Sequence, residues 1–230
     1  EAMIHAFDRF GLRVTHGWGM TETSPVGTVN YLKRELESLP VDEQYGIRAK
    51  QGVPLPFFEV RAMGPEGEAP WDGATMGELQ VRGPWVAARY HDLDEASDKW
   101  TEDGWFCTGD IAIIDAAGYV KITDRLKDLI KSGGEWISSI DLENALASHP
   151  AVAEAAVIAV PHAKWGERPL AVVVMKPGRT ATGPELGAHL AQRFASFWLP
   201  DGYVFVDEMP RTATGKILKT ALRERYGGGA

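Results

Sequence analysis

The chain has a single cysteine, no long apolar run and no excess of positive charge, and each of these absences excludes a class of protein. Cys107 is the only cysteine among 230 residues, so an internal disulfide framework is excluded and a reducing compartment is expected. The longest apolar run, residues 155–161, is far too short to span a bilayer. With no basic start followed by an apolar segment, the sequence predicts a cytoplasmic protein without a transmembrane segment.

No part of the chain has a large excess of positive charge, and the negative charge is concentrated in the first half. The net charge is −8. Residues 1–125 hold 12 Lys+Arg against 21 Asp+Glu, whereas residues 126–230 hold 12 against 11. An acidic chain without a basic stripe lacks the electrostatic footprint of a nucleic-acid-binding protein, so no nucleic-acid partner is expected. The six histidines show no metal-ligand spacing. The sequence leaves homo-oligomer formation open.

The first half of the chain is typical of short strands separated by turns that carry glycine and proline. Five stretches mix β-branched or aromatic residues with polar ones and are predicted strands: Leu12–Gly17, Phe57–Met63, Glu78–Gly83, Ile111–Ile114 and Tyr119–Thr123. The turn at residues 115–118 joins the last two and indicates a hairpin. We therefore expect an antiparallel, barrel-like layer over residues 1–125.

The second half alternates helices and strands. The predicted helices are Ile140–Ser148, Pro184–Phe197 and Lys216–Tyr226, and the predicted strands are Glu154–Val160, Leu170–Met175 and Tyr203–Val206. This order predicts a compact α+β domain over residues 126–230. The domain boundary is expected at the charged turn 125–127, and the whole chain is assigned to the α+β class.

The segment Ile122–Asn144, ITDRLKDLIKSGGEWISSIDLEN, is the part of the sequence that says most about function. A strand-like start ends in the charged turn Asp124–Lys127, and a short apolar strand, Asp128–Lys131, leads into a glycine pair. Ser138, followed three residues later by Asp141, forms a capping box that opens a helix. Core packing does not require these features in this order. The segment resembles the hinge of the adenylate-forming enzymes, which include acyl-CoA synthetases, adenylation domains of peptide synthetases and luciferases, and most of all that of medium- and long-chain fatty acyl-CoA synthetases.

Residues 18–23, WGMTET, have side chains that suit a nucleotide. An aromatic ring can pack on adenine, glycine allows close backbone approach, a hydroxyl can meet the α-phosphate, and a carboxylate can hold Mg²⁺, which prefers oxygen ligands. Taken alone, the pattern is more typical of a strand end capped by threonine and glutamate. The segment is similar to the superfamily's aromatic-Gly-x-Thr-Glu motif. The resemblance implies that Trp18 packs on adenine, that Gly19 allows close backbone approach, that Thr21 binds the phosphate and that Glu22 binds Mg²⁺. The last role also makes Glu22 a catalytic candidate.

Residues 103–110, DGWFCTGD, end in a carboxylate that follows a glycine. A carboxylate can accept hydrogen bonds from two ribose hydroxyls, and Gly109 would let it approach them. In isolation, a type I turn before a strand is the better interpretation. The segment resembles the superfamily's aromatic-x-Thr-Gly-Asp motif, which implies that Asp110 binds the ribose. Cys107 has no neighbouring base and is expected to be a half-buried spectator.

The hinge segment contains two charged candidates. Arg125 presents a fork of donors that suits ribose or phosphate oxygens. Lys127 occupies the place where the superfamily pivots its small domain between two half-reactions, and a hinge absorbs a large change in φ and ψ at few residues. The resemblance therefore implies nucleotide binding for Arg125 and a pivot at Lys127.

Four more candidates follow within the same segment. Gly133 and Gly134 would give a loop on which the pantetheine arm of CoA lies without side-chain obstruction. Lys131 matches a lysine implicated in the second half-reaction of some relatives. Trp136 matches an aromatic that fatty acyl-CoA synthetases place near adenine as a gate. The alternative for Trp136 is a tryptophan that covers the core beside a helix start.

Residues 210–219, PRTATGKILK, resemble the last motif of the superfamily, Pro-[Arg/Lys]-Thr-x-[Ser/Thr]-Gly-Lys. The Gly215-Lys216 pair is not a Walker A loop, because Pro210 stands where that loop requires its first glycine. A lysine on a flexible loop before a helix can reach a distant site, and its compact charge can stabilise the transition state of adenylation. The resemblance therefore makes Lys216 the catalytic lysine. The bland alternative is a basic helix N-terminus.

Together the motifs imply an ATP-dependent fatty acid–CoA ligase that uses Mg²⁺. A carboxylate attacks the α-phosphate of ATP, and the acyl group then passes to CoA. The superfamily's Ser/Thr/Gly-rich phosphate loop and acid tunnel are expected upstream of Trp18, and the chain opens as EAMIHAFDRF without an initiator methionine. We therefore expect the C-terminal part of a longer enzyme that is inactive alone. The alternatives are a superfamily member with another acid or acceptor, such as a carrier-protein adenylation domain or a luciferase-like enzyme, and a non-catalytic binding module.

Overall fold

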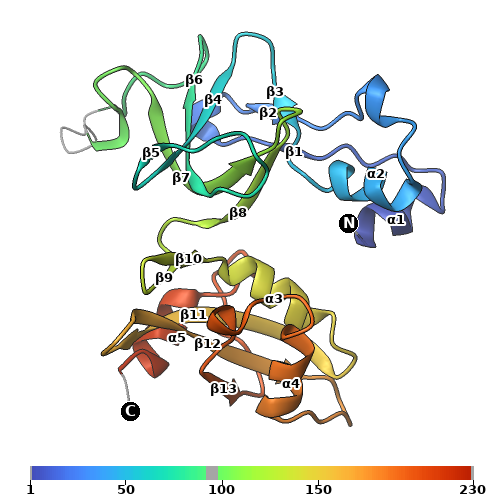
Figure 1. Cartoon of the computed structure of the whole chain (residues 1–230), viewed down its shortest axis with the longest axis vertical. Coiled ribbons are helices and arrows are strands. Elements are labelled where there is room, and N and C mark those ends of the chain that lie inside the picture. Colours follow the sequence, from blue (N-terminus) through green and yellow to red (C-terminus); the bar gives the residue numbers. More distant parts are fainter. Residues whose placement is uncertain (1, 92–97, 229–230) are drawn as a thin grey trace. The chain divides into compact units, whose positions relative to one another are not determined.

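The computed structural model describes residues 2–91 and 98–228 (Figure 1). The chain divides into two compact units, unit 1 over residues 1–123 and unit 2 over residues 124–230. Both units mix helices with sheets, which confirms the predicted α+β class. In the part of the chain that the structure describes, no helix has the length and apolar character needed to cross a membrane.

An open five-stranded sheet forms the centre of unit 1. Its strands are β4 (Glu59–Gly64), β5 (Gly67–Glu68), β6 (Gly77–Arg82), β7 (Phe106–Ile114) and β8 (Val120–Arg125). They lie in the order β5-β4-β6-β7-β8, and β6 pairs antiparallel with both β4 and β7. Leu79, Val81 and Phe106 are buried together in its core. The predicted β-rich layer is present, but its described strands form open sheets rather than a closed barrel.

A small three-stranded sheet carries the first motif of unit 1. It consists of β1 (Gly17–Trp18), β2 (Thr28–Val29) and β3 (Val53–Pro54), all antiparallel. Two short helices, α1 (Ala2–Asp8) and α2 (Val41–Arg48), complete the unit with the 3₁₀ turns η1 (Thr21–Thr23) and η2 (Arg34–Leu36). Buried Asn30 donates from Nδ2 to the carbonyls of Ile47 (2.8 Å) and Lys50 (2.9 Å), which joins the sheet to the end of α2.

The limits of the predicted strands of unit 1 differ from the observed ones, and β7 begins at Phe106 rather than at the expected Ile111. Residues 12–16 are irregular, and the expected strand Leu12–Gly17 is reduced to β1, because pairing with β2 begins only at Gly17. The strand expected from Phe57 begins at Glu59 instead. Phe57 has a φ of +67° and is 84% exposed, so it lies in a turn despite its strand propensity.

Unit 2 is built on a five-stranded sheet. Its strands are β9 (Ile130–Ser132), β10 (Glu135–Ile137), β11 (Val152–His162), β12 (Gly166–Met175) and β13 (Gly202–Phe205). The long strands β11 and β12 pair antiparallel. On the other side of β12, β13 pairs in parallel, and β9 pairs at Gly166. The helices are α3 (Ser139–Ala147), α4 (Gly183–Leu190) and α5 (Lys219–Tyr226), with a 3₁₀ turn η4 (Ser196–Trp198).

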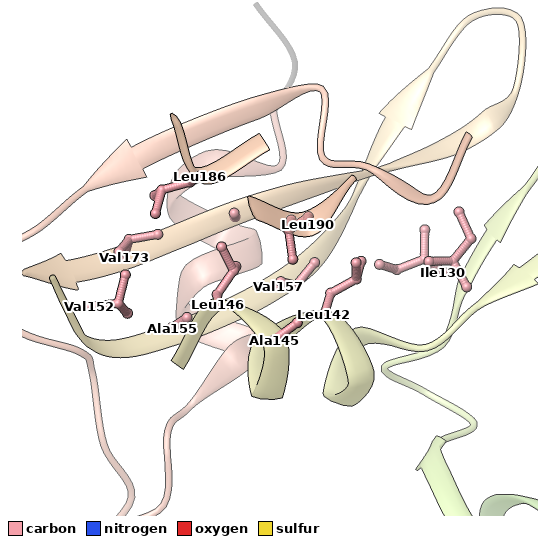
Figure 2. Close-up of a cluster of buried hydrophobic side chains, with 12 residues drawn as sticks. Ile130, Leu142, Ala145, Leu146, Val152, Ala155, Val157, Val173, Leu186 and Leu190 are labelled. Atoms are coloured by element: carbon pink, nitrogen blue, oxygen red, sulfur yellow. The ribbon is translucent and has the colours of Figure 1, made fainter. Parts of the chain in front are cut away.

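Helices cover both faces of this sheet. Alternate residues of a strand point to opposite faces, so neighbouring residues of one strand join different cores. On β11, Ala155 and Val157 join a core with α3 and α4, whereas Ala156 and Ile158 join a second core with α5. Figure 2 shows the first core, where labelled side chains of α3 and α4 meet those of the sheet. A continuous apolar run, which alone does not distinguish a strand from a buried helix, is thus a strand buried on both faces.

Side-chain caps open α3 and α4 of unit 2 but not α5, and two helix limits differ from prediction by several residues. The Ser138 hydroxyl accepts from the Asp141 N–H (3.0 Å), which is the N-terminal half of the predicted capping box and opens α3. The helix expected over residues 184–197 ends at Leu190, followed by a turn and η4. The last helix starts at Lys219 rather than Lys216, because Lys216 belongs to a hydrogen-bonded turn.

Candidate functional site

In unit 1, the fold joins the two predicted nucleotide motifs directly. The indole Nε1 of Trp18 donates to Oδ2 of Asp110 at 2.8 Å, although the two residues lie 92 positions apart in the chain. Trp18 is half-buried at the end of β1, and Asp110 is buried within β7 with 3% exposure. The hydrogen bond orients the indole ring relative to the carboxylate, an acceptor-only group that suits hydroxyl donors.

A bulge in β7 sets the position of Asp110. Glu78 of β6 pairs with Ile111, but Gln80 pairs with Cys107, so the ladder shifts between them. Gly109 lies in this irregularity with a φ of +71°, and its N–H donates to Oε1 of Glu78 at 3.1 Å. The turn considered for residues 103–110 is thus a bulged strand from Phe106 onward, a feature that commonly redirects side chains beside functional sites.

The loop after Trp18 is closely packed against its own backbone. A Cβ added at Gly19 would lie 1.9 Å from the carbonyl oxygen of Pro25, so only glycine fits. The Thr23 hydroxyl, which is fully buried, accepts from the Met20 N–H at 2.9 Å and closes η1. This leaves Thr21 exposed on the outside of the turn. The sequence interpretation missed Thr23, although threonine side chains commonly bond to backbone groups three or four residues earlier in the chain.

Glu22 is oriented by a residue that the motif does not contain. The Tyr90 hydroxyl donates to Oε1 of Glu22 at 2.6 Å, and this bond raises the pKa of Tyr90 to about 12. Nothing in the sequence around Tyr90 indicates the contact, which depends on the fold. Among residues 2–91 and 98–228, no group of three or more His, Cys, Asp or Glu side chains is gathered as a metal site. Glu22 thus fits Mg²⁺ only as one carboxylate ligand beside oxygens from elsewhere.

In unit 2, a compact turn carries the predicted hinge. The N–H groups of Asp128 and Leu129 both donate to the Arg125 carbonyl at 2.9 Å, which leaves the Arg125 and Lys127 side chains exposed. Both flanks of the turn are held. Asp124 accepts from the Ser139 N–H at 2.6 Å, and Asp128 forms an ion pair with Arg223 of α5.

A half-buried group of charged side chains lies beside the hinge turn. Lys219 of α5 places Nζ 2.6 Å from both the Ser139 hydroxyl and Oε1 of Glu143. Burial raises the pKa of Asp124 and of Glu143, and the Lys219 ammonium offsets part of this effect on each. The sequence interpretation missed this group. The available signal was the spacing of Lys219 and Arg223, which lie four residues apart on one helix face.

The glycine pair is the turn of a hairpin rather than an open loop. Ser132 of β9 pairs with Glu135 of β10, and the two residues between them, Gly133 and Gly134, have φ values of +60° and +90°. Two positive φ values are what a two-residue hairpin turn of the primed type requires. Lys131 and Trp136 pair across the same hairpin, so their side chains share one face. The predicted strand Asp128–Lys131 begins only at Ile130.

A pocket of about 450 Å³ opens beside this hairpin. A Cβ at Gly133 would lie 2.7 Å from the Trp165 ring, so the hairpin packs closely on that indole. Arg168, only 8% exposed, donates from Nε to Asp201 at 3.0 Å and from Nη1 to the Ser132 hydroxyl at 3.1 Å. The pocket is lined by Ser132, Gly133, Glu135, Trp165, Arg168, Ser196, Phe197 and Asp201.

Lys216 stands on a tight turn before α5. Its N–H donates to the Thr212 hydroxyl (3.2 Å), and its carbonyl accepts from the Thr212 N–H (2.8 Å). Gly215, with a φ of +84°, donates to the Thr212 carbonyl at 2.9 Å. The expected flexible loop is therefore a closed turn with the Lys216 side chain exposed.

Comparisons with known proteins match both halves of the chain to one enzyme family. A model of the AMP-binding enzyme matches residues 1–91, and a model of the AMP-binding enzyme C-terminal domain matches residues 141–216. The chain belongs to the AMP-binding enzyme family. This confirms the resemblance to adenylate-forming enzymes. The matches contain Trp18, Thr21, Glu22 and Lys216, whereas Asp110 lies between them.

Named relatives span the entire length of this chain. A long-chain-fatty-acid–CoA ligase from Thermus thermophilus is 54% identical over 98% of this chain. A 3-methylmercaptopropionyl-CoA ligase from Ruegeria pomeroyi is 47% identical, and a medium-chain-fatty-acid–CoA ligase from Ectopseudomonas oleovorans is 46% identical, each over 98% of the chain. The chain spans only 41–42% of the length of these relatives.

Solved structures of the same superfamily share the fold. ATP-bound MatB from Rhodopseudomonas palustris superposes with a TM-score of 0.79 at 34% identity, and the match covers 95% of this chain and 41% of that one. An o-succinylbenzoate CoA synthetase from Bacillus subtilis, in complex with its acyl-adenylate intermediate, gives a TM-score of 0.81 at 30% identity. That match covers all of this chain and 45% of the other.

Proposed function

We propose that this chain is part of an ATP-dependent fatty acid–CoA ligase of about the length of its relatives. In the first half-reaction a carboxylate attacks the α-phosphate of ATP and releases pyrophosphate. In the second, the thiol of CoA attacks the acyl carbonyl of the adenylate, the carbon–sulfur bond of the thioester forms, and AMP and the thiol proton are released. The observation that carries the proposal is the 2.8 Å hydrogen bond between Trp18 and Asp110, because it unites an adenine platform with a ribose acceptor.

Unit 1 would hold the nucleotide. The Trp18 ring packs on adenine, and the Asp110 carboxylate, which is a hydrogen-bond acceptor, accepts from the ribose hydroxyls. The exposed Thr21 hydroxyl meets the α-phosphate, and Gly19 lets the backbone approach it. The close packing of Gly19 on Pro25 and the buried Thr23 bonds support this assignment, since they hold the loop in shape before nucleotide arrives.

Glu22 would be the protein's ligand to Mg²⁺. Mg²⁺ keeps an octahedral set of oxygens and in nucleotide enzymes is bound by one or two carboxylates plus substrate phosphates. A single carboxylate oriented by the Tyr90 hydroxyl fits that demand. When bound, the ion would neutralise charge on the polyphosphate. Glu22 would supply the carboxylate ligand, and the Tyr90 hydroxyl would hold that carboxylate in a constant direction.

Lys216 would act in the first half-reaction. A lysine ammonium is a compact charge that stabilises the negative charge growing on the α-phosphate in the transition state. The backbone of Lys216 is held in a hydrogen-bonded turn, and its side chain is exposed. This arrangement supports the proposed role, because the ammonium group must reach a nucleotide bound by other residues. In-line displacement at phosphorus relies mainly on such positioning and charge stabilisation.

The hinge and the glycine hairpin would act in the second half-reaction. We propose a pivot at Lys127, with Arg125 on the nucleotide and the pantetheine arm of CoA along Gly133 and Gly134. The adjoining pocket supports this placement, because Trp165 and Phe197 offer aromatic surface there. Lys131 and Trp136, on one face of the hairpin, would contribute a charge to thioester formation and an aromatic gate near adenine.

The acid is proposed to be a medium- or long-chain fatty acid, as the names of two relatives state for those proteins. The competing acid is 3-methylmercaptopropionate, named in a relative of 47% identity. We also propose a reducing, cytoplasmic location. The location is supported by the single cysteine of this sequence, which offers Cys107 no disulfide partner within it. Burial raises the pKa of the Cys107 thiol, so this thiol is also a poor nucleophile.

The test uses the full-length protein with ATP, Mg²⁺ and a panel of acids from butyrate to palmitate plus 3-methylmercaptopropionate. We expect acid-dependent AMP release with CoA as acceptor and the highest kcat/KM for an acid of eight or more carbons, on the order of a hundredfold above butyrate, because each buried CH₂ contributes about 0.8 kcal/mol. A preference for 3-methylmercaptopropionate would select the competing acid. Acyl transfer to a carrier protein but not to CoA would contradict the proposed acceptor.

A further inference from the structure

We infer that Arg211 and Glu154 form a positioning pair for Lys216, an inference that rests on the proposed function. Arg211 donates from Nη2 to both carboxylate oxygens of Glu154 at 2.6 Å and from Nη1 to the Gly215 carbonyl at 2.8 Å. One guanidinium therefore bridges strand β11 and the peptide that immediately precedes Lys216. Its planar fork suits this double task.

The bridged turn is joined to the rest of unit 2 at both of its ends. Within the turn, Thr212 holds both backbone groups of Lys216, and Arg211 pairs with Ile217 across it. These bonds fix the shape of the turn but not its direction from the sheet. Ile217 packs on the core beside α5 and anchors one side. On the other side, Met209 is buried in the same core before the turn, and the Arg211–Glu154 pair holds the turn itself. These contacts together set the direction in which Lys216 leaves the sheet.

The charge and exposure of the pair indicate that its role is geometric. The Arg211 and Glu154 side chains remain 43% and 39% exposed, and ion pairs this exposed contribute little to stability. A displacement of about 1 Å at a reacting group, in contrast, can lower a rate about a hundredfold. Removing the pair should therefore slow the step that uses Lys216 while the unit stays folded.

The experiment uses the full-length enzyme with Arg211→Gln, Glu154→Gln, the double variant, and Lys216→Ala as reference. Arg225→Gln is the matched control, since Arg225 is an exposed arginine on α5 whose guanidinium lies over Tyr226. Three quantities are measured. They are acyl-dependent pyrophosphate release, thioester formation from pre-made acyl-adenylate and the midpoint of thermal unfolding.

We expect Arg211→Gln to lower kcat of adenylation about 10- to 100-fold with a smaller change in KM for ATP. Glu154→Gln should have a smaller effect, because the bond to Gly215 remains. The double variant should be no slower than Arg211→Gln, since both residues act through one contact. Thioester formation and the unfolding midpoint should stay close to the wild-type values, and Arg225→Gln should change neither half-reaction.

Two results separate failure of this inference from failure of the proposed function. If Lys216→Ala lowers adenylation but Arg211→Gln and Glu154→Gln do not, the positioning pair is wrong and the role of Lys216 stands. If Lys216→Ala leaves adenylation unchanged, the proposed role of Lys216 fails and the inference falls with it. A parallel loss of both half-reactions and of thermal stability in Arg211→Gln would overturn the inference by making Arg211 structural.

Discussion

The Trp18–Asp110 site of unit 1 and the Lys216 turn of unit 2 are built in opposite ways. The first joins residues 92 positions apart and buries its carboxylate. The second is closed by bonds among residues 211–217 and exposes its lysine. A site assembled by the fold keeps its geometry throughout a reaction, whereas an exposed side chain on a preformed turn can enter and leave. We therefore propose that unit 1 holds the nucleotide in both half-reactions, while unit 2 supplies different groups to each.

The largest expected effect concerns the exposed lysine. In the full-length enzyme, Lys216→Ala should lower acyl-dependent pyrophosphate release about 10²- to 10³-fold, the range found when one donor to a developing charge is removed. Lys219→Ala is not a suitable control, because half-buried Lys219 forms an ion pair with Glu143. Lys176→Ala removes a lysine outside the Lys216 turn, one bonded to the Pro150 carbonyl, and should leave the rate unchanged. If Lys216→Ala retained more than half the wild-type rate, the proposal that the Lys216 turn of unit 2 acts in adenylation would fail.

A slightly smaller effect is expected at the hinge. Proline at position 127 fixes φ near −65° and removes an N–H, so Lys127→Pro should remove the second conformation of the turn. We expect thioester formation to fall about a hundredfold, while acyl-dependent pyrophosphate exchange is kept. Lys127→Ala should be mild, because backbone freedom remains. Unchanged thioester formation in the proline variant would place the pivot outside residues 125–127.

A change in unit 1 should affect both half-reactions together. Asp110→Asn keeps the size of the side chain but removes its charge and weakens its bonds to Trp18 and to ribose. Hydrogen bonds to charged groups contribute about 1.5–3 kcal/mol, so each half-reaction should slow roughly tenfold or more. Asp103→Asn is the control, since Asp103 is exposed and pairs with Arg61. Loss confined to adenylation would show that unit 1 does not serve both steps.

The smallest expected effect is a pH dependence of stability in unit 2. Burial raises the pKa of Glu143 above its ordinary value of 4.5. A carboxyl whose folded-state pKa is raised stabilises the fold at low pH, and this contribution is lost as pH rises through the folded pKa. The free energy of unfolding of the wild type relative to Glu143→Gln should therefore increase as pH falls from 7 toward 4.5. Glu224→Gln, exposed on α5, should show no such trend.

Local signals predicted the elements of unit 2 well because they are decided within a few residues. Ser138 caps α3 as its spacing with Asp141 indicates. The strands β11 and β12 contain their predicted stretches because apolar β-branched runs suit a sheet covered on both faces. Element ends were less predictable. The start of α5 at Lys219 depends on the bond of Thr212 to Lys216, which propensity does not report.

The candidate site was predictable as motifs but not as contacts. Short motifs point to Trp18, Asp110 and Lys216 as candidate site residues, because each is flanked in the sequence by the residue types of its motif. The partners that orient them come from elsewhere. Tyr90 reaches Glu22 from 68 positions away, and Glu154 reaches Arg211 from 57 positions away. Such pairs follow from how strands and loops are brought together, so only a three-dimensional structure reveals them.

The most direct test of this division of labour is the rate at which full-length Lys216→Ala converts pre-made acyl-adenylate and CoA into acyl-CoA in a single turnover. The account predicts a rate close to that of the wild type, because Lys216 acts only while the adenylate forms. It also predicts that Asp110→Asn, measured in the same way, is slowed. A fall in the Lys216→Ala rate that matches its loss of adenylation would contradict the account, because the exposed lysine would then serve both half-reactions.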